Sequence, residues 1–161
     1  MKDDLNELLA FYSHVQPLLV PFYANLSDMH NFKHINEVLL YALNITHVEQ
    51  IPEKYLKSVI FACAFHDCAR INDENDPDHG ERALPIIDKF MALYGQYFEV
   101  TEEEIDLIKD AVKNHTSTMP GTTDNPVLKT LADADRIRMA KDLGYDEKYF
   151  NYDYSKYLAQ N

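Results

Sequence analysis

The chain has 161 residues, of which 46% are hydrophobic, a composition typical of a globular protein with a buried core and not of a disordered chain. Its 27 acidic residues outnumber 15 basic ones, which gives a formal net charge of -12, and no cluster of Lys and Arg occurs. We therefore expect no duplex nucleic acid partner, whereas a small phosphorylated substrate remains compatible because a bound divalent cation supplies positive charge locally.

The first residues and the cysteines indicate a compartment. The chain begins Met1-Lys2-Asp3-Asp4, which lacks the basic start and the apolar stretch of a secretory signal. No uninterrupted apolar run approaches the length needed to cross a bilayer. Two cysteines, Cys63 and Cys68, suit a reducing compartment and do not indicate a disulfide scaffold. We expect a cytoplasmic protein with no membrane partner.

Apolar residues recur at helical spacing from the start of the chain. A first helix is predicted over about 3–15, and Pro17 and Pro21 should interrupt it. Ser27 or Asp28 is suited to cap the next helix. One face of that second helix carries His34, Ile35, Val38, Leu39, Ala42 and Leu43.

A third helix is predicted to start near Pro52, which suits a first helical turn. Its apolar stripe consists of Leu56, Val59, Ile60 and Cys63. The sequence stays almost wholly apolar as far as Phe65 and then continues directly into His66-Asp67. A polar pair at the end of a buried helix loses its hydration, so another group must satisfy it, and a metal ion is one such group.

The second half of the chain is also helical by pattern. A fourth helix is predicted from about 78 to 94. Thr101 and Glu104 have the spacing of a capping box and open a fifth helix that ends at about His115. A last helix should begin at Pro126.

No alternating segment is long enough to build a sheet on. The sequence therefore predicts an all-α fold, a single domain over 1–161 that forms a bundle of about six helices. The segment 145–161 is rich in tyrosine and acidic residues. It either packs back on the bundle or serves an interface, and a homodimer stays open.

Histidine and aspartate side chains fall at or near the ends of the apolar stripes. In chain order they are His34, His66, Asp67, His79, His115 and Asp135. Imidazole with carboxylate is a ligand set for Mn, Fe, Ni, Co, Mg or Zn, and a mixed shell leaves positions for water and substrate. The i, i+4 pair His30 and His34 does not form a zinc-protease motif, because Asn31 stands where that motif requires Glu.

Three motifs follow one another in a specific order. They are His34-Ile35-Asn36-Glu37-Val38, the apolar run into His66-Asp67, and Leu131-Ala132-Asp133-Ala134-Asp135-Arg136, all within about residues 30–141. Together they resemble the HD-domain superfamily of metal-dependent phosphohydrolases, which are all-α proteins. The resemblance implies that His34, His66, Asp67 and Asp135 hold a metal, with Asp133 as the alternative to Asp135.

The resemblance also bears on His79 and His115, which stand where some members of the superfamily carry extra histidines. It implies either ligands for a second metal or contacts with the substrate phosphate, and ordinary loop histidines are the alternative. Cations beside the motifs are candidates for phosphate binding, with surface salt bridges as their alternative. These candidates are Arg70, Arg136, Arg138 and Lys113, and His30 is a neighbour of the pocket.

The function that the resemblance implies is hydrolysis of a phosphoester or phosphoanhydride in a nucleotide or related small metabolite, with one or two divalent metals. Asp67 would bind metal and orient the attacking water, while His79, His115 or Arg70 would steady the phosphate or protonate the leaving oxygen. Two alternatives stay open. One is a di-iron oxygenase of the same superfamily with the same six ligands, and the other is a nucleotide-binding regulatory module without catalysis.

Overall fold

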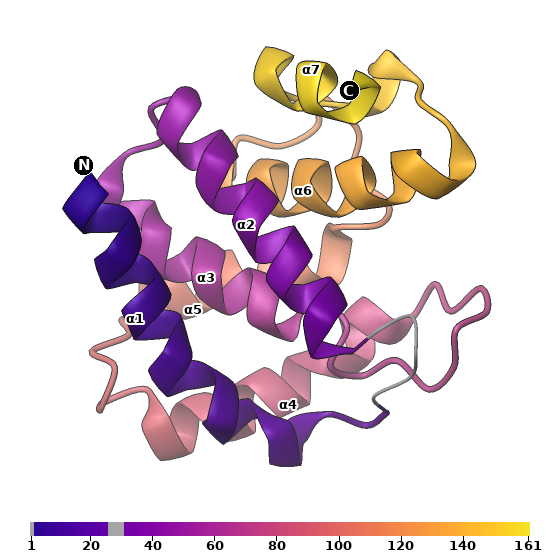
Figure 1. The fold of residues 1–161 in the computed structure, drawn as a ribbon. Coiled ribbons are helices and arrows are strands. Elements are labelled where there is room, and N and C mark those ends of the chain that lie inside the picture. Colours follow the sequence, from indigo (N-terminus) through magenta and orange to yellow (C-terminus); the bar gives the residue numbers. More distant parts are fainter. Residues whose placement is uncertain (1, 26–30) are drawn as a thin grey trace.

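The computed structural model describes residues 2–25 and 31–161, and this part of the chain is helical without a strand (Figure 1). Its α-helices are α1 (Lys2–Leu19), α2 (Phe32–Val48), α3 (Leu56–Phe65), α4 (His79–Tyr94), α5 (Glu102–Asn114), α6 (Pro126–Leu143) and α7 (Asp153–Gln160). Short 3-10 helices occupy Val20–Phe22, Glu53–Tyr55 and Glu147–Tyr149. The predicted all-α class is confirmed, with α7 added to the six expected helices.

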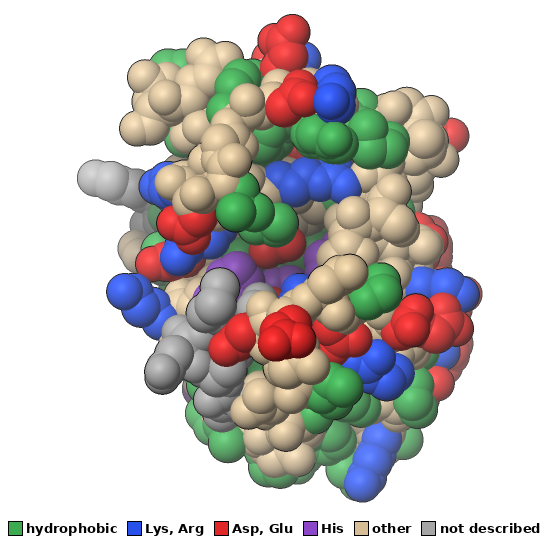
Figure 2. All heavy atoms as spheres, turned by 90° about the vertical axis from the view of Figure 1, so that its right-hand side faces the viewer, with side chains coloured by type: hydrophobic (Ala, Val, Ile, Leu, Met, Phe, Trp, Pro, Cys, Tyr) green, Lys and Arg blue, Asp and Glu red, His purple; other side chains and the backbone are tan. Residues whose placement is uncertain are grey.

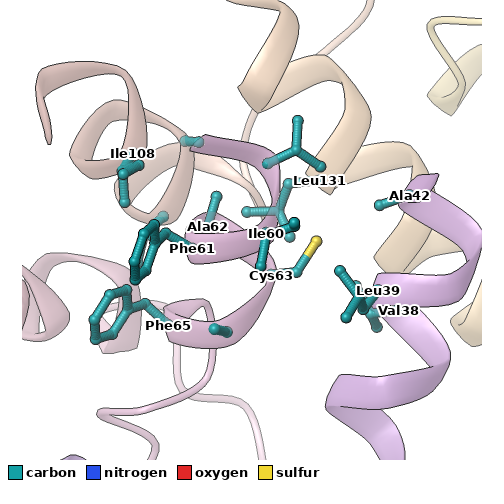
Figure 3. Packing of buried hydrophobic residues seen from close by; sticks show 14 of the residues in the cluster. Val38, Leu39, Ala42, Ile60, Phe61, Ala62, Cys63, Phe65, Ile108 and Leu131 are labelled. Atoms are coloured by element: carbon teal, nitrogen blue, oxygen red, sulfur yellow. The ribbon is translucent and has the colours of Figure 1, made fainter. Parts of the chain in front are cut away.

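Helix α3 lies at the centre of the molecule because it is apolar on every side. All of its residues from Ser58 to Phe65 are buried, and it packs against α1, α2, α5 and α6. Figure 3 shows Phe61 and Phe65 directed to the side of Ile108, while Cys63 faces Val38 and Leu39 of α2. A helix that is hydrophobic all round is stable only when other helices surround it. The polar residues that follow α3 are thereby placed inside the protein.

The predicted break of the first helix at Pro17 was wrong, because α1 continues through this proline to Leu19. A proline inside a helix costs about 3 kcal/mol. Val15 and Leu19 are fully buried on the last turns, and burying each such side chain gains about 1.5–3 kcal/mol. Their packing against the core offsets the lost hydrogen bond, so the helix ends only where the Val20–Phe22 turn begins.

Other helix ends follow the expected signals closely. The capping box of Thr101 and Glu104 is confirmed by hydrogen bonds in both directions, and α6 begins at Pro126 as expected. The cap of α2 is Asn31, whose side chain accepts hydrogen bonds from the first turn, and the expected caps at 27 and 28 lie outside the described residues. Pro52 precedes the short turn Glu53–Tyr55 and not the first turn of α3 itself.

The C-terminal segment packs back on the bundle, where α7 contacts α6 and α2 (Figure 1). Its anchor is the carboxylate of Asp133, which is fully buried in α6. Asp133 accepts hydrogen bonds from the backbone and side-chain amides of Asn151 at 2.8–2.9 Å and from the backbone of Tyr152 at 3.0 Å. Of the two roles open for this segment, packing against the bundle is the one observed. Among the described residues, no helix has the length and apolar character of a membrane span.

We expect Asp133→Ala to destabilise the protein by about 2–3 kcal/mol, because it leaves partly buried amides of the C-terminal segment without their acceptor. Urea unfolding measures the loss, and hydrogen exchange should rise in α7 before it rises in α3. Asp153→Ala is the matched control, since its exposed carboxylate pairs with Lys156 at the surface. Equal stability of the two variants would contradict the anchoring role.

Candidate metal centre

Five helices bring the histidine and aspartate side chains of the three motifs together. His34 comes from α2, His66 and Asp67 follow α3, His79 opens α4, His115 follows α5, and Asp135 lies in α6. Figure 2 shows histidine side chains at the base of a hollow, with acidic and basic side chains around it. Within the described residues, two groups have ligand atoms within 4.8 Å of one another: His34, His66 and Asp67, and then Asp67, His79 and His115.

The first group is compact and lies between α2, α3 and α6. The Nε2 atoms of His34 and His66 are 3.2 Å apart, and Asp67 Oδ2 lies 3.3 Å from the first and 3.2 Å from the second. Asp135 Oδ1 stands beside them, 3.4 Å from His34 Nε2 and 3.8 Å from His66 Nε2. The four residues that the resemblance implies as ligands of one metal therefore lie close together.

The second group uses the other oxygen of the same aspartate. Asp67 Oδ1 is 3.3 Å from Nε2 of His79, and the Nε2 atoms of His79 and His115 are 3.2 Å apart. His79 and His115 are almost fully buried and are not exposed loop histidines. Asp67 thus directs one carboxylate oxygen toward each group, so the two groups share this residue.

Hydrogen bonds to backbone carbonyls determine which ring nitrogen carries the proton. Nδ1 of His66 lies 2.7 Å from the carbonyl of Cys63, and Nδ1 of His115 lies 2.7 Å from that of Val112. Nδ1 of His79 is 2.5 Å from the carbonyl of Asp76. A carbonyl only accepts, so Nδ1 is the donor in each ring and the Nε2 of the neutral ring is a bare acceptor. Second ring nitrogens that are fixed in this way are typical of metal-ligating histidines.

The donor set fits a metal ion. The Nε2 atoms of His79 and His115 face each other at 3.2 Å, while the Nδ1 atom of each ring lies against a backbone carbonyl. This orientation leaves both Nε2 atoms available as metal ligands. An octahedral shell with bonds of about 2.1 Å has edges of roughly 3.0 Å, and a tetrahedral shell has edges of roughly 3.4 Å. The distances of 3.2–3.4 Å around Asp67 Oδ2, Asp67 Oδ1 and His34 Nε2 match those edges.

The carboxylates of the centre are held ionised despite their burial. Burial acts to raise the pKa of Asp67, but the neighbouring His66 and His34 outweigh it and hold the pKa well below its usual range. Burial opposes ionisation of Asp135 as well, and the hydrogen bond with His34 leads the contacts that lower its pKa. The centre therefore offers two ionised carboxylates to a bound cation.

Two histidines of the centre have pKa values shifted in opposite directions. Burial lowers the pKa of His34, but hydrogen bonds with Asp135 and Asp67 outweigh it and raise the value to about 9. Burial, followed by the nearby His66, lowers the pKa of His115 to about 4. Without a metal, His34 therefore carries a proton at neutral pH, whereas His115 stays neutral and ready to coordinate.

Asp133 and Asp135 face different parts of the molecule, although one residue separates them. Asp135 Oδ1 is directed to His34, while Asp133 binds the amides of Asn151. On this placement Asp135 belongs to the centre, and Asp133 is a structural anchor. The expected role of Asp133 as an alternative ligand has no support in its surroundings.

The candidate phosphate-binding cations are placed differently from one another. Arg70 lies at the centre, where its Nε donates to Asp67 Oδ1 at 3.0 Å. Arg136 donates to the backbone carbonyls of Thr118 and Tyr149, and Arg138 donates to the carboxylates of Glu37 and Asp142. Lys113 pairs with Glu81 at the surface. His30 lies outside the described residues.

Gly80 is a residue that the sequence reasoning did not single out, although it follows His79 directly. A Cβ added there would lie 2.5 Å from the carbonyl oxygen of Val112 and 2.7 Å from that of Lys113. Only glycine lets α4 approach the backbone of α5 this closely. The approach joins His79 to His115, and the adjacent His-Gly pair is the sequence signal that could have revealed it.

Comparison with protein-family models, with curated proteins and with solved structures finds no match to this chain.

We expect metal binding to release a proton from His34, so the affinity for the first metal should rise with pH up to about pH 9, by at most about tenfold per pH unit. Titration calorimetry in buffers of different ionisation enthalpy counts the protons, and about one should leave at neutral pH.

In the metal-free protein, the same shift makes the stability of the fold decrease as pH rises. The folded-state pKa of His34 exceeds its usual 6.5, so protonation stabilises the fold fully below pH 6.5, and this stabilisation is lost as pH rises through about 9. A metal affinity that does not change with pH would contradict the proton release, and urea unfolding without a loss of stability between pH 6.5 and 9 would contradict the second statement.

Proposed function

We propose that the chain is a metal-dependent phosphohydrolase with two metal positions that share Asp67, acting on a phosphoester or phosphoanhydride of a nucleotide or related small metabolite. The observation that carries the proposal is that the two carboxylate oxygens of Asp67 face different groups of histidines. One of its oxygens lies within 3.3 Å of His34 and His66, and the other lies 3.3 Å from His79. The motifs that resemble the HD-domain superfamily supply the reaction class.

The first position would be held by His34, His66, Asp67 and Asp135, and the second by Asp67, His79 and His115. Divalent metals bound there would polarise the phosphoryl group and make water nucleophilic at neutral pH. Mn, Fe, Ni, Co, Mg and Zn are all compatible with an imidazole and carboxylate shell. The first position is the more open one, since the side chains of His34 and Asp135 are 11% and 13% exposed while that of His79 in the second position is only 1% exposed. Substrate would therefore enter from the hollow, on the side of α2 and α6.

The chain's own groups limit how protons and phosphate are handled. His115 does not suit the role of general acid, because its pKa of about 4 leaves it without a proton at neutral pH. Arg70 holds Asp67 Oδ1 and donates to the carbonyl of Glu74, so it orients Asp67 and stays close enough to contact a bound phosphate. Arg138 is partly exposed, but its pairing with the carboxylates of Glu37 and Asp142 leaves it less suited than Arg70 to bind a phosphate.

A di-iron oxygenase is the second candidate, and the same bridging arrangement favours it. Its six ligands would be the same residues, so geometry does not separate the two reactions. Iron retained through purification, together with oxygen consumption, would support this candidate.

The test is the metal content of protein purified without chelator, measured by elemental mass spectrometry on wild type, His79→Ala and Asp67→Ala. We expect about two metals per chain in wild type, one in His79→Ala and none retained in Asp67→Ala. Hydrolysis of a panel of phosphorylated metabolites, assayed with added manganese, nickel or cobalt, should fall by more than about 10²-fold in Asp67→Ala.

His47→Ala is the matched control, because His47 is an exposed histidine of α2 away from the motifs. It should keep both metals and full activity. Unchanged hydrolysis by Asp67→Ala, or wild type that binds no metal after reconstitution, would overturn the proposed function.

A further inference from the structure

A buried carboxylate stands inside the polar loop that joins the two groups of ligands. Asp76 lies between α3 and α4 among exposed neighbours, yet only 8% of its surface is accessible. It is not among the residues whose ligand atoms converge on the centre. Its own contacts explain its burial.

The side chain of Asp76 fastens the start of the loop to the first turns of α4. Its Oδ2 accepts a hydrogen bond from Nη2 of Arg82 at 2.5 Å and one from the backbone amide of Ile71 at 3.4 Å. The same Nη2 of Arg82 donates to the carbonyl of Ala69 at 3.2 Å. Arg82 and Asp76 thus close the loop back on the segment that follows Asp67.

The backbone carbonyl of Asp76 acts directly on His79. It lies 2.5 Å from Nδ1 of His79 and also accepts from the backbone amide of His79 at 3.4 Å. The first contact places the ring proton on Nδ1 and leaves Nε2 directed to Asp67 and His115. Any displacement of this carbonyl would rotate the ring or free its tautomer.

We propose that Asp76 and Arg82 are positioning residues for the second metal position, and that they set its affinity without touching the metal. The proposal rests on the proposed function in requiring His79 as a ligand. The histidines of the first position come from α2 and from the end of α3, which the core holds, so they depend less on the loop than His79 does. Loss of the Asp76–Arg82 pair should therefore act on one position and spare the other.

The direct test is metal binding by Asp76→Ala and Arg82→Ala. Each variant should weaken the second metal by about 10–100-fold, the range for groups that orient a ligand, and leave the first metal at its wild-type affinity. The double variant should lose no more than the stronger single variant, because both remove the same link. Asp88→Ala is the control, since it removes an exposed ion pair between α4 and α5 with Lys109 and should keep both metals.

If Asp76→Ala and Arg82→Ala bind both metals with wild-type affinity, the proposal is overturned. Equal weakening of both metals would overturn it as well, because that result indicates general destabilisation. Arg82→Ala guards against a folding defect, since the Arg82 side chain is 38% exposed and lies outside the core.

A measurement on the metal-free protein judges the proposal independently of the proposed function. Long-range ¹H–¹⁵N NMR of the imidazoles should show His79 as a single Nδ1–H tautomer in wild type and as a mixture of tautomers in Asp76→Ala, with His66 unchanged. An unaltered His79 spectrum overturns the positioning role. If wild type binds no metal, but Asp76→Ala still changes the His79 tautomer, the result refutes the proposed function and supports the positioning role.

Discussion

The buried carboxylate of Asp67 is the group around which the rest of the centre is arranged. It is there because α3 is apolar on every side and can be stable only inside the bundle, so that the residues following Phe65 emerge in the interior. An ionised carboxylate in that environment is costly unless positive charge and hydrogen bonds surround it. His34 and His66 on one side, and Arg70 on the other, answer this requirement. The same requirement makes the site receptive to a metal.

The ends of helices supply the second constraint. The last carbonyls of an α-helix have no partner within the helix, and a buried end must find donors elsewhere. His66 and His115 each follow a helix and give Nδ1–H to the carbonyl three residues back, in α3 and α5 respectively. One contact thus satisfies a helix end and fixes the imidazole tautomer with Nε2 facing the centre. Histidines placed directly after apolar helices therefore combine a local backbone need with the geometry of a ligand.

Much of this arrangement could be predicted from the sequence, because helical periodicity and caps are local signals. The apolar run into His66-Asp67, the capping box at Thr101 and the start of α6 were all visible in that way. The course of α1 through Pro17 was not, because it depends on the burial of Leu19 against distant residues. The partners of Asp133, Arg136 and Arg138 were also hidden, since they lie on segments far away in the chain. Sequence patterns identified the residue types of the centre, whereas tertiary packing decided which of them face it.

The two halves of the centre differ in what holds them, and this difference has a consequence for their properties. The first group is carried by α2, α3 and α6, whose facing residues are buried in the core (Figure 3). The second depends on the loop before α4 and on the close contact of Gly80 with the backbone of α5. Loops open at lower free energy than core helices do. The position around His34 and His66 should therefore bind metal more tightly and with a more constant occupancy. The occupancy of the position around His79 and His115 should vary most with metal concentration and with changes in the loop.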